Sequence, residues 1–344
     1  MFYYSSNGLV FQSKVKALEY QIKTGNEICY YYFDHIYSKL DWTTEPSNTL
    51  DFYYREQAQR LREKYDYLIL AYSGGYDSTN ILETFHFNNI RLDKIVIVGA
   101  FGQDSGFGAD ENLNGELYKN AFPYIEKLGL TSITEKYDYT ELFDNPANNL
   151  SVLSHGDDWV DHTGGWFSPH HWFWRDIEKH IIPQNIGSKK VGLIFGRDKP
   201  TLQHDSTFNF YDTPINCYGN IIGTDNCDRI AFYWDPEYPL ILIKQLHVLN
   251  RLKNSGLKSS YSEYFGAQAF SGVDINQIIY NLKQPLIYKS PKSKTNIISL
   301  RDSYLYRKTN SNVYKYFADG IKNISSRVHV SNMKPIRTRN YKIQ

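Results

Sequence analysis

The chain alternates between short apolar runs and stretches with helical periodicity, and this alternation constrains its fold most strongly. The runs Tyr67–Tyr72 and Lys94–Val98 are short, apolar and typical of buried strands. We expect strands over residues 67–72, 94–98, 131–136 and 191–195, helices over residues 50–64, 78–87, 113–128 and 241–252, and short strands and turns over residues 205–236. Strands separated by helices pair in parallel through right-handed crossovers. The sequence therefore predicts an α/β fold: a parallel sheet with helices on both faces.

The 344 residues suffice for one large or two medium domains. We expect an N-terminal extension over residues 1–64, a core domain over residues 65–255 and a basic C-terminal region over residues 256–344. The longest apolar runs are far shorter than the roughly 18 residues of a membrane span, and the first residues lack the pattern of a signal peptide. Three cysteines without a CxxC pair argue against a disulfide framework. We therefore expect a cytoplasmic protein with no membrane partner.

The formal net charge of +1 conceals a strong asymmetry along the chain. Residues 283–344 hold 14 Lys and Arg against 2 acids, a net charge of +12, so the remaining residues have a net charge of −11. Tyrosines such as Tyr304, Tyr306 and Tyr314 are interleaved with these cations. Cations bind phosphates and aromatic rings stack on bases, which makes the basic region a candidate for nucleic-acid binding. The alternative is that the region packs on the acidic body of the protein.

The strongest local signal is the run Ser73-Gly74-Gly75-Tyr76-Asp77-Ser78-Thr79, between a predicted strand and a predicted helix. Two adjacent glycines let the backbone approach a ligand and present N–H groups, and the helix N-terminus adds the positive end of its dipole. The hydroxyls of Ser73, Ser78 and Thr79 add further donors. Asp77 would repel a phosphate unless a cation lies between them, which implies Mg²⁺. These features predict a polyphosphate cradle at the carboxyl end of a parallel strand.

This run is neither a GxxxxGKS/T loop nor a GxGxxG dinucleotide turn. Residues 73–78 match the pattern SGGxDS, and the run resembles the PP-loop of the ATP pyrophosphatase superfamily. The similarity is greatest to the synthetase domain of asparagine synthetase and implies a PP-loop (HUP-like) sheet over about residues 60–250. Enzymes of this superfamily use ATP and Mg²⁺ to attach AMP to an acceptor oxygen, and a nitrogen or sulfur nucleophile then displaces the AMP. The alternative is a tight glycine turn that only caps a helix.

The resemblance assigns ATP-binding roles to the residues of the first turn. The expected phosphate-binding residues are Ser73, Gly74, Gly75, Asp77, Ser78 and Thr79. Asp77 is also the first expected Mg²⁺ ligand. Ligands of open parallel sheets bind beyond the strand ends, so we expect the adenine near Val98, at the end of the second strand.

A second candidate segment, Gly196–Pro200, follows the fourth predicted strand. Asp198 matches a second Mg²⁺ ligand of the asparagine synthetase family by position, and Lys199 or Arg197 is a candidate for binding pyrophosphate. The resemblance thus makes Asp77, Asp198 and Lys199 the candidate catalytic residues, with Asp77 and Asp198 as the metal ligands. The alternative is a solvated turn that ends at Pro200.

The source of the nucleophile is less defined than the ATP site. The asparagine synthetase family begins with a nucleophilic cysteine after the initiator Met, and Phe2 stands at that position here. The resemblance therefore implies that the chain does not release ammonia from glutamine itself. Ammonia would come from solution or from a separate ammonia source, or an amine of another substrate would take its place.

Residues 155–180 are rich in His and Trp and resemble an irregular insert between strands. The five histidines of this segment are His155, His162, His170, His171 and His180. Aromatic packing, a pocket for the acceptor substrate and a metal site are the three interpretations, and no fixed metal-binding spacing such as HExxH supports the last.

Three functions fit the whole pattern. The first is an AMP-forming ligase or amidotransferase that acts on a small-molecule acceptor, which we favour because the turn is better supported than any nucleic-acid module. The second applies the same adenylation to a nucleobase of tRNA or DNA. The third is a nucleotide-binding protein without turnover.

Overall fold

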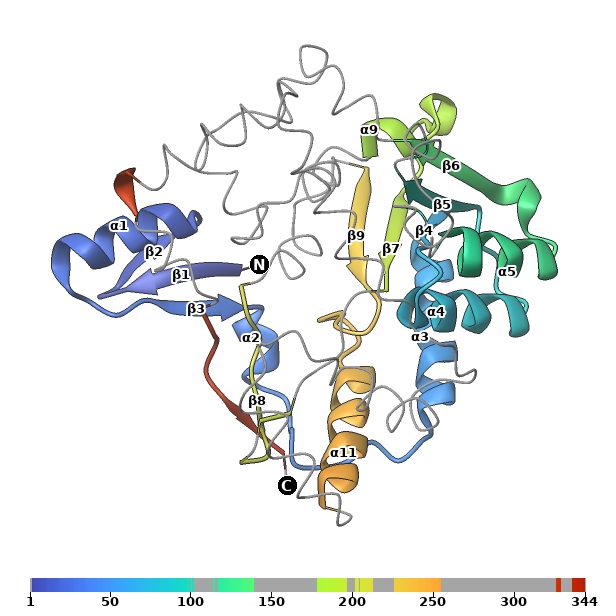
Figure 1. Cartoon of the computed structure of the whole chain (residues 1–344). Helices are drawn as coiled ribbons and strands as arrows, with labels where there is room; N and C mark the ends of the chain where they lie inside the picture. Colours follow the sequence, from blue (N-terminus) through green and yellow to red (C-terminus); the bar gives the residue numbers. More distant parts are fainter. Residues whose placement is uncertain are drawn as a thin grey trace.

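The computed structural model describes residues 2–99, 101, 114, 117–138, 178–196, 202–203, 205–212, 226–254, 326–328 and 336–343 (Figure 1). Its centre is a five-stranded sheet in which every pair is parallel. The strands, in chain order, are β4 (Tyr67–Ala71), β5 (Lys94–Gly99), β6 (Thr134–Asp138), β7 (Val191–Phe195) and β9 (Cys227–Ala231). The predicted parallel sheet is thus confirmed, but β9, expected only among short strands and turns, is a full member of it.

The order of the strands across the sheet creates a switch point next to β4. The order is β6-β5-β4-β7-β9, so the chain builds one side of the sheet from β4 outwards and then crosses over to build the other side. Ala71 and Phe195 are paired in register at the carboxyl ends of β4 and β7. Open parallel sheets bind their ligands at such a point, outside the carboxyl ends of the strands.

The two faces of the sheet differ in what covers them among the described residues. One face, with Leu70 and Ile95, packs against helices α3 (Leu50–Lys64), α4 (Tyr76–Phe87), α5 (Phe122–Lys127) and α11 (Leu240–Asn254). The other face, with Ile69 and Val96, packs against Ile181 of the short helix α9 (Glu178–Ile181) and against Ile186 at the end of η6 (Gln184–Ile186). Both faces carry helical segments, as expected, but the first face has by far the longer ones.

The helix expected over residues 113–128 is interrupted where the structure describes it. A π-helix, η2 (Leu117–Ala121), precedes α5, which has Pro123 in its first turn. Proline lacks the N–H that an uninterrupted helix would bond to the preceding turn, so the change in helix type occurs where that bond is missing. A short 3₁₀ turn, η3 (Thr131–Ile133), occupies the expected start of the third strand, which therefore begins at Thr134.

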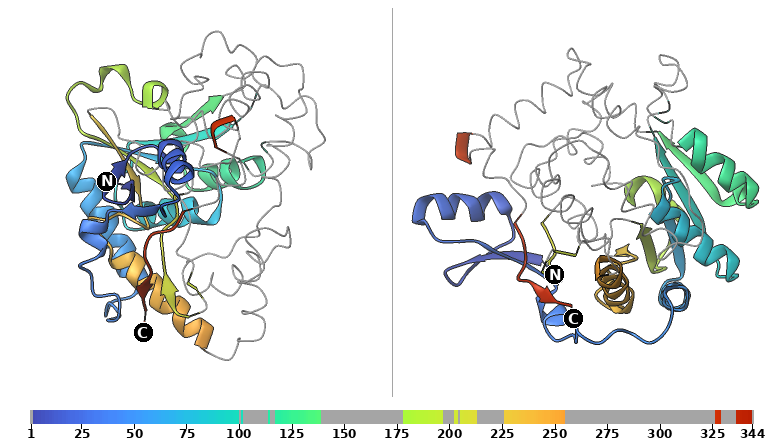
Figure 2. Two further views of the ribbon diagram at one scale, coloured as in Figure 1. Left: turned by 90° about the vertical axis from the view of Figure 1, so that its left-hand side faces the viewer. Right: turned by 60° about the horizontal axis from the view of Figure 1, so that its bottom comes forward.

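The N-terminal residues form a smaller antiparallel sheet with the order β2-β1-β3. Its strands are β1 (Phe2–Ser6), β2 (Leu9–Phe11) and β3 (Cys29–Tyr32), followed by the short helix α2 (Asp34–Tyr37). Helix α1 (Lys14–Thr24) covers one face of this sheet (Figure 2). Tyr37 of α2 donates a hydrogen bond of 2.8 Å to the carbonyl of Trp234, just beyond β9, which joins the two sheets.

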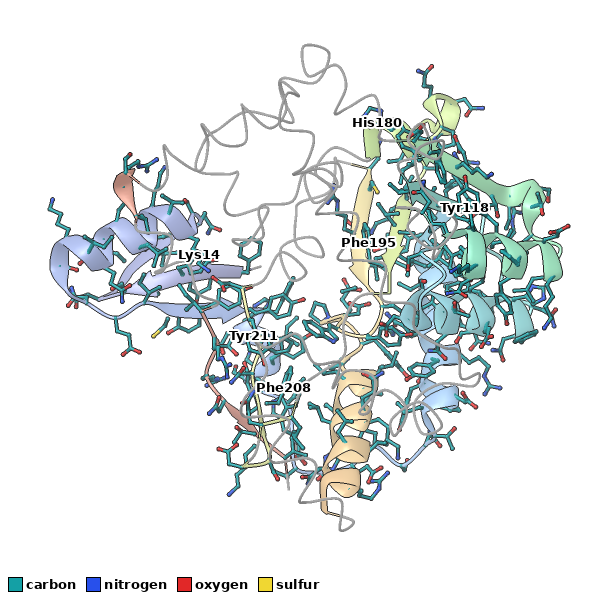
Figure 3. The ribbon with its side chains drawn as sticks, viewed as in Figure 1. Lys14, Tyr118, His180, Phe195, Phe208 and Tyr211 are labelled. Atoms are coloured by element: carbon teal, nitrogen blue, oxygen red, sulfur yellow. The ribbon has the colours of Figure 1, made fainter. Side chains whose placement is uncertain are left out.

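The C-terminal end of the basic region packs on the body of the protein. Strand β10 (Tyr341–Lys342) pairs with β8 (Thr207–Phe208), and the ring of Tyr341 stacks on Trp42 at 4.7 Å. Figure 3 shows Phe208 and Tyr211 between the N-terminal sheet and α11. Most of the basic region, including residues 312–324, for which the sequence predicts a helix, lies outside the described residues. For residues 336–343, the expected alternative of packing on the body is therefore the one observed.

No helix within the described ranges is both long enough and apolar enough to cross a membrane.

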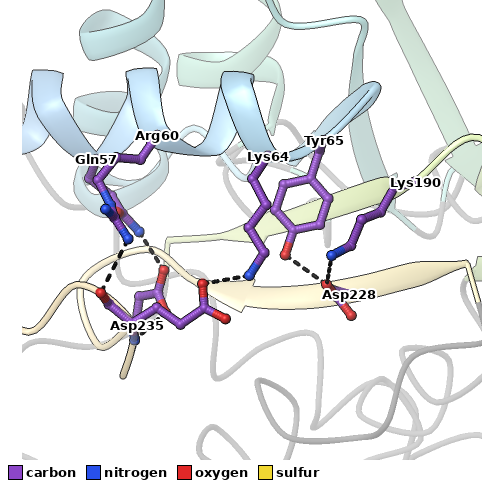
Figure 4. A network of polar contacts seen from close by, with 8 residues as sticks. Gln57, Arg60, Lys64, Tyr65, Lys190, Asp228 and Asp235 are labelled. Atoms are coloured by element: carbon purple, nitrogen blue, oxygen red, sulfur yellow. Dashed lines mark hydrogen bonds and ion pairs between the residues drawn. The ribbon is translucent and has the colours of Figure 1, made fainter.

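A network of polar contacts fixes α3 to the segment that follows β9 (Figure 4). Gln57 donates a hydrogen bond of 2.7 Å to Asp235, and the ammonium of Lys64 contacts the carboxylate of Glu237 at 2.5 Å. Burial raises the pKa of the Asp235 carboxyl, against the effect of its hydrogen bonds from Gln57 and the Glu237 backbone. The folded protein therefore holds a proton at Asp235 more tightly than the unfolded chain does.

This raised pKa predicts a pH effect on stability. A carboxyl with a raised pKa stabilises the fold while it is protonated, and that contribution is lost as the pH rises from about 4 through the pKa of the folded state. Asp235→Asn has no charge to titrate, so it should flatten the pH dependence of the unfolding free energy. Both Asp235 oxygens accept an N–H bond and Asn keeps only one acceptor, so the substitution should cost about 1 kcal/mol at pH 4. Urea unfolding at pH 4 to 7 would measure both effects. The wild-type protein, unfolded under the same conditions, gives the reference slope.

Candidate functional site

The glycine turn of residues 73–75 lies at the carboxyl end of the central strand β4, next to the switch point. Gly74 has φ +76°, a left-handed conformation that side chains rarely adopt. Gly75 is extended and is the N-cap of α4, which begins at Tyr76, two residues earlier than expected. No side chain makes a capping hydrogen bond at this end of α4. The N-terminus of a twelve-residue helix is therefore presented by a turn without bulky side chains, which suits an anion.

The hydroxyls of the turn are used mainly to hold its shape. The Ser78 hydroxyl accepts from the Ser73 N–H at 3.2 Å and lies 3.1 Å from the Ser73 hydroxyl, and it also donates to the Gly75 carbonyl at 3.3 Å. Thr79 is buried, and its hydroxyl lies 3.2 Å from that of Tyr72. Ser73 itself is exposed. Of the three hydroxyls expected to face the phosphates, that of Ser73 is the most accessible.

Three neighbouring segments hold the turn and the first turn of α4. A Cβ on Gly74 would lie 2.8 Å from the backbone nitrogen of Ala121, at the end of η2. A Cβ on Gly196, directly after β7, would lie 2.7 Å from the backbone nitrogen of Ser78. Close backbone contacts of this kind require glycine at both positions. The residue directly after β7 therefore lies against the first turn of α4, next to the glycine turn.

The third contact comes from the residues that follow β9. The hydroxyl of Tyr233, which is fully buried, donates a hydrogen bond of 2.9 Å to the backbone carbonyl of Asp77 and accepts one of 3.0 Å from Asn80. Burial raises the pKa of the neighbouring Tyr54 hydroxyl well above its usual range, and the charge of Asp77 adds to the rise. Asp77 thus lies near the buried hydroxyls of Tyr54 and Tyr233, which pack against the first turn of α4.

Val98 lies at the end of β5, next to β4, as expected. Its side chain is buried in the apolar cluster that contains Ala71 and Phe195. A Cβ on the following Gly99 would meet Phe101, Asn114 and Leu117 at less than 3 Å. A ligand at the end of β5 would therefore contact the backbone and the side chains that follow the strand, not the side chain of Val98. The position of the adenine stays a prediction.

Several predicted site residues lie outside the described part of the chain. These include Arg197, Asp198 and Lys199 of the second segment and, of the histidine-rich segment, all its histidines except His180. His180 lies at the edge of the sheet, with its ring 5.4 Å from that of Tyr137. Within the ranges that the structure covers, no group of three or more His, Cys, Asp or Glu side chains is arranged to hold a metal ion. The roles of Asp198 and Lys199 stay predictions.

Two residues that hold the turn, Tyr233 and Ala121, were not predicted from the sequence. Tyr233 comes two residues after the end of β9, so identifying residues 227–231 as a parallel strand would have placed Tyr233 at the carboxyl edge. The strand was hard to identify because Asp228 and Arg229 interrupt its apolar pattern. Ala121 carries no comparable signal, because its contact depends on the packing of η2 against the glycine turn.

The assignment of this site rests on its residues and their geometry. No family model matches the chain, and no curated protein matches it either. The resemblance of the glycine turn therefore concerns residues 73–78 and their position between β4 and α4.

Proposed function

We propose that the chain is an ATP-dependent, AMP- and pyrophosphate-forming ligase that adenylates an acceptor oxygen, which a nitrogen nucleophile then displaces. The observation that supports this best is the position of the SGGYDS turn: it joins the central strand β4 to the N-terminus of α4 at the switch point of a parallel sheet. Gly74, at φ +76° against the backbone of Ala121, fixes the shape of this turn.

The residues of the turn fit the groups that this reaction needs. The backbone of residues 73–75 and the N-terminus of α4 would bind the phosphates, because N–H groups and the helix dipole favour negative charge. Asp77, in the first turn of α4, would hold Mg²⁺ through its carboxylate. When bound, Mg²⁺ neutralises charge on the phosphates as the bond breaks.

The chemistry balances in two steps. An oxygen of the acceptor attacks the α-phosphorus of ATP, the bond between that phosphorus and the bridging oxygen breaks, and pyrophosphate leaves. The nitrogen nucleophile then attacks the acceptor carbon and loses a proton to the solvent, and the acceptor oxygen departs with AMP. Charge grows on pyrophosphate in the first step, where the N–H groups of the turn would stabilise it. The ATP requirement fits the cytoplasmic location that we propose.

The test follows the acceptor oxygen. The purified chain would be incubated with ATP, Mg²⁺, ammonium and small carboxylates labelled with ¹⁸O, and in a parallel arm with tRNA and nucleosides. We expect AMP and pyrophosphate, with ¹⁸O from the carboxylate in the AMP. Turnover with the nucleoside arm alone would instead identify the nucleobase-modifying alternative. ADP and phosphate as products, or AMP without the label in the carboxylate arm, would contradict the proposal.

A further inference from the structure

Among the described residues, the N-terminal sheet has one face covered by α1 and one open face. Side chains alternate along its strands, and those facing α1 are buried, as for Tyr4 and Tyr30, each about 1% exposed. The open face is formed by the residues that point the other way: Tyr3, Ser5, Val10, Cys29 and Tyr31. Val10 is 61% exposed and Cys29 is also exposed. Figures 1 and 2 show α1 on the opposite side of the strands.

An aromatic pair stands on this open face. Tyr3 of β1 and Tyr31 of β3 are direct cross-strand partners, and their rings are stacked with centroids 4.8 Å apart and planes 9° from parallel. Both residues are part-exposed. β3 is an edge strand of the described sheet, so the stack can be extended by a third flat ring at its Tyr31 end. A cross-strand pair of this kind can also serve only to stabilise the sheet. The charges next to the pair distinguish that structural role from ligand binding.

One arginine, Arg339, lies near the Tyr31 end of the stack. Arg339 is close enough for its charge to act on the Tyr31 hydroxyl; its side chain is 52% exposed, and it contacts Asp34 at 3.1 Å. Its guanidinium also lies 5.4 Å from the ring centroid of Tyr341. Arg337, two residues earlier and also exposed, stacks over Tyr211 at 4.9 Å. Both arginines belong to the region with a net charge of +12.

We propose that this open face binds single-stranded nucleic acid, with a base stacked on the Tyr3–Tyr31 pair and a phosphate bound by Arg339. Stacked aromatic rings accept any base, and exposed guanidinium groups bind the phosphates between bases. The rings stand on the surface of a sheet, where a single strand can place its unpaired bases. In Figure 1 and in the right-hand view of Figure 2, the N-terminal sheet and α4 lie on opposite sides of the described structure, so this binding does not depend on the proposed ATP chemistry.

The test uses substitutions in the full-length chain, because a truncation near Gly320 would also remove β10 and the buried residues Tyr341 and Ile343. Fluorescence anisotropy with labelled oligo(U) RNA and oligo(dT) DNA would measure affinity at 50 and 200 mM salt. Tyr31→Ala should weaken binding by about fivefold to a hundredfold, as expected for the loss of a stacked base. Tyr31→Phe retains the ring and should bind almost as the wild type does.

Arg339→Ala should weaken binding and reduce the slope of log affinity against log salt by about 0.7, for one phosphate contact on a single strand. Arg55, which stacks over Phe52 on α3 at 5.6 Å, gives the matched control: Arg55→Ala should leave affinity and slope unchanged. Circular dichroism would establish that each variant is folded. The RNA and DNA measurements show whether the face binds RNA, DNA or both, and binding to either supports the proposal.

Asp77→Ala should bind the oligonucleotides as the wild type does, which separates this proposal from the ATP site. No measurable binding by the wild type, or equal binding by Tyr31→Ala, would overturn the proposal. A dimer of the wild type would also overturn the proposal under two conditions: Tyr31→Ala abolishes the dimer, and added nucleic acid does not dissociate it. The open face would then bind a second copy of the chain.

Discussion

Asp77→Asn should lower the rate of AMP and pyrophosphate formation by about a hundredfold or more, while the protein stays folded. The substitution removes the carboxylate that would hold Mg²⁺ beside the phosphates. It leaves the backbone carbonyl of residue 77, which is the group that accepts the hydrogen bond from Tyr233. The expected cost in stability is the lost interaction of one acid with the α4 dipole, about 0.3–1 kcal/mol. Initial rates over a range of Mg²⁺ concentrations, together with thermal unfolding, would measure the two effects.

The chain contains a matched control for this substitution. Asp51 is the second residue of α3, just as Asp77 is the second residue of α4, and each is the acid of its helix's first turn. Asp51→Asn should therefore reproduce the small loss in stability but keep the wild-type rate. A full rate for Asp77→Asn would contradict the assigned role, and an equal loss of rate in both variants would attribute the effect to helix stability.

The parts of the fold that the sequence predicted are those with strong local patterns. Residues 67–71 and 191–195 are apolar on both faces because both are inner strands of the parallel sheet. Thr49 caps α3 by accepting a hydrogen bond from the Phe52 N–H, a signal contained within four residues. β9 is an edge strand, where Asp228 can face solvent and interrupt the apolar run, so its pattern resembled a turn-rich segment.

The candidate site likewise has a part that could be predicted from local sequence and a part that could not. The shape of the glycine turn depends on residues 73–78 themselves, and those could be identified from their types and order. The groups that position the turn come from residues 121, 196 and 233, distant in sequence, and only the strand order brings them to one edge of the sheet. Net charge predicted an anionic partner for the C-terminal region, but a count of charges contains no information on pairing. Arg339 contacts Asp34 and Arg327 contacts Glu19, both on the N-terminal part of the chain.

The largest expected loss of stability is at Asp212, which joins three segments of the chain. Its carboxylate contacts the Lys14 ammonium at 2.7 Å, and both side chains are at most 1% exposed. It also accepts hydrogen bonds from the Tyr4 hydroxyl at 3.1 Å and from the Ile336 N–H at 2.6 Å. Asp212→Ala leaves the Lys14 ammonium buried without its counter-ion. The free energy of unfolding should therefore fall by about 3–5 kcal/mol, a large share of the 5–15 kcal/mol of a typical domain.

Two further variants identify the cause of that loss. Glu237→Ala breaks the more exposed pair with Lys64 and should cost under about 1 kcal/mol in urea unfolding. The double variant Lys14→Met with Asp212→Asn removes both charges and keeps an acceptor for the Ile336 N–H, so it should recover most of the stability. In Asp212→Ala, faster hydrogen exchange over residues 336–343 should accompany the loss, because the Ile336 bond helps to hold this segment on the body. A cost for Asp212→Ala no larger than that of Glu237→Ala would show that the buried pair does not join the N-terminal sheet to the C-terminal segment.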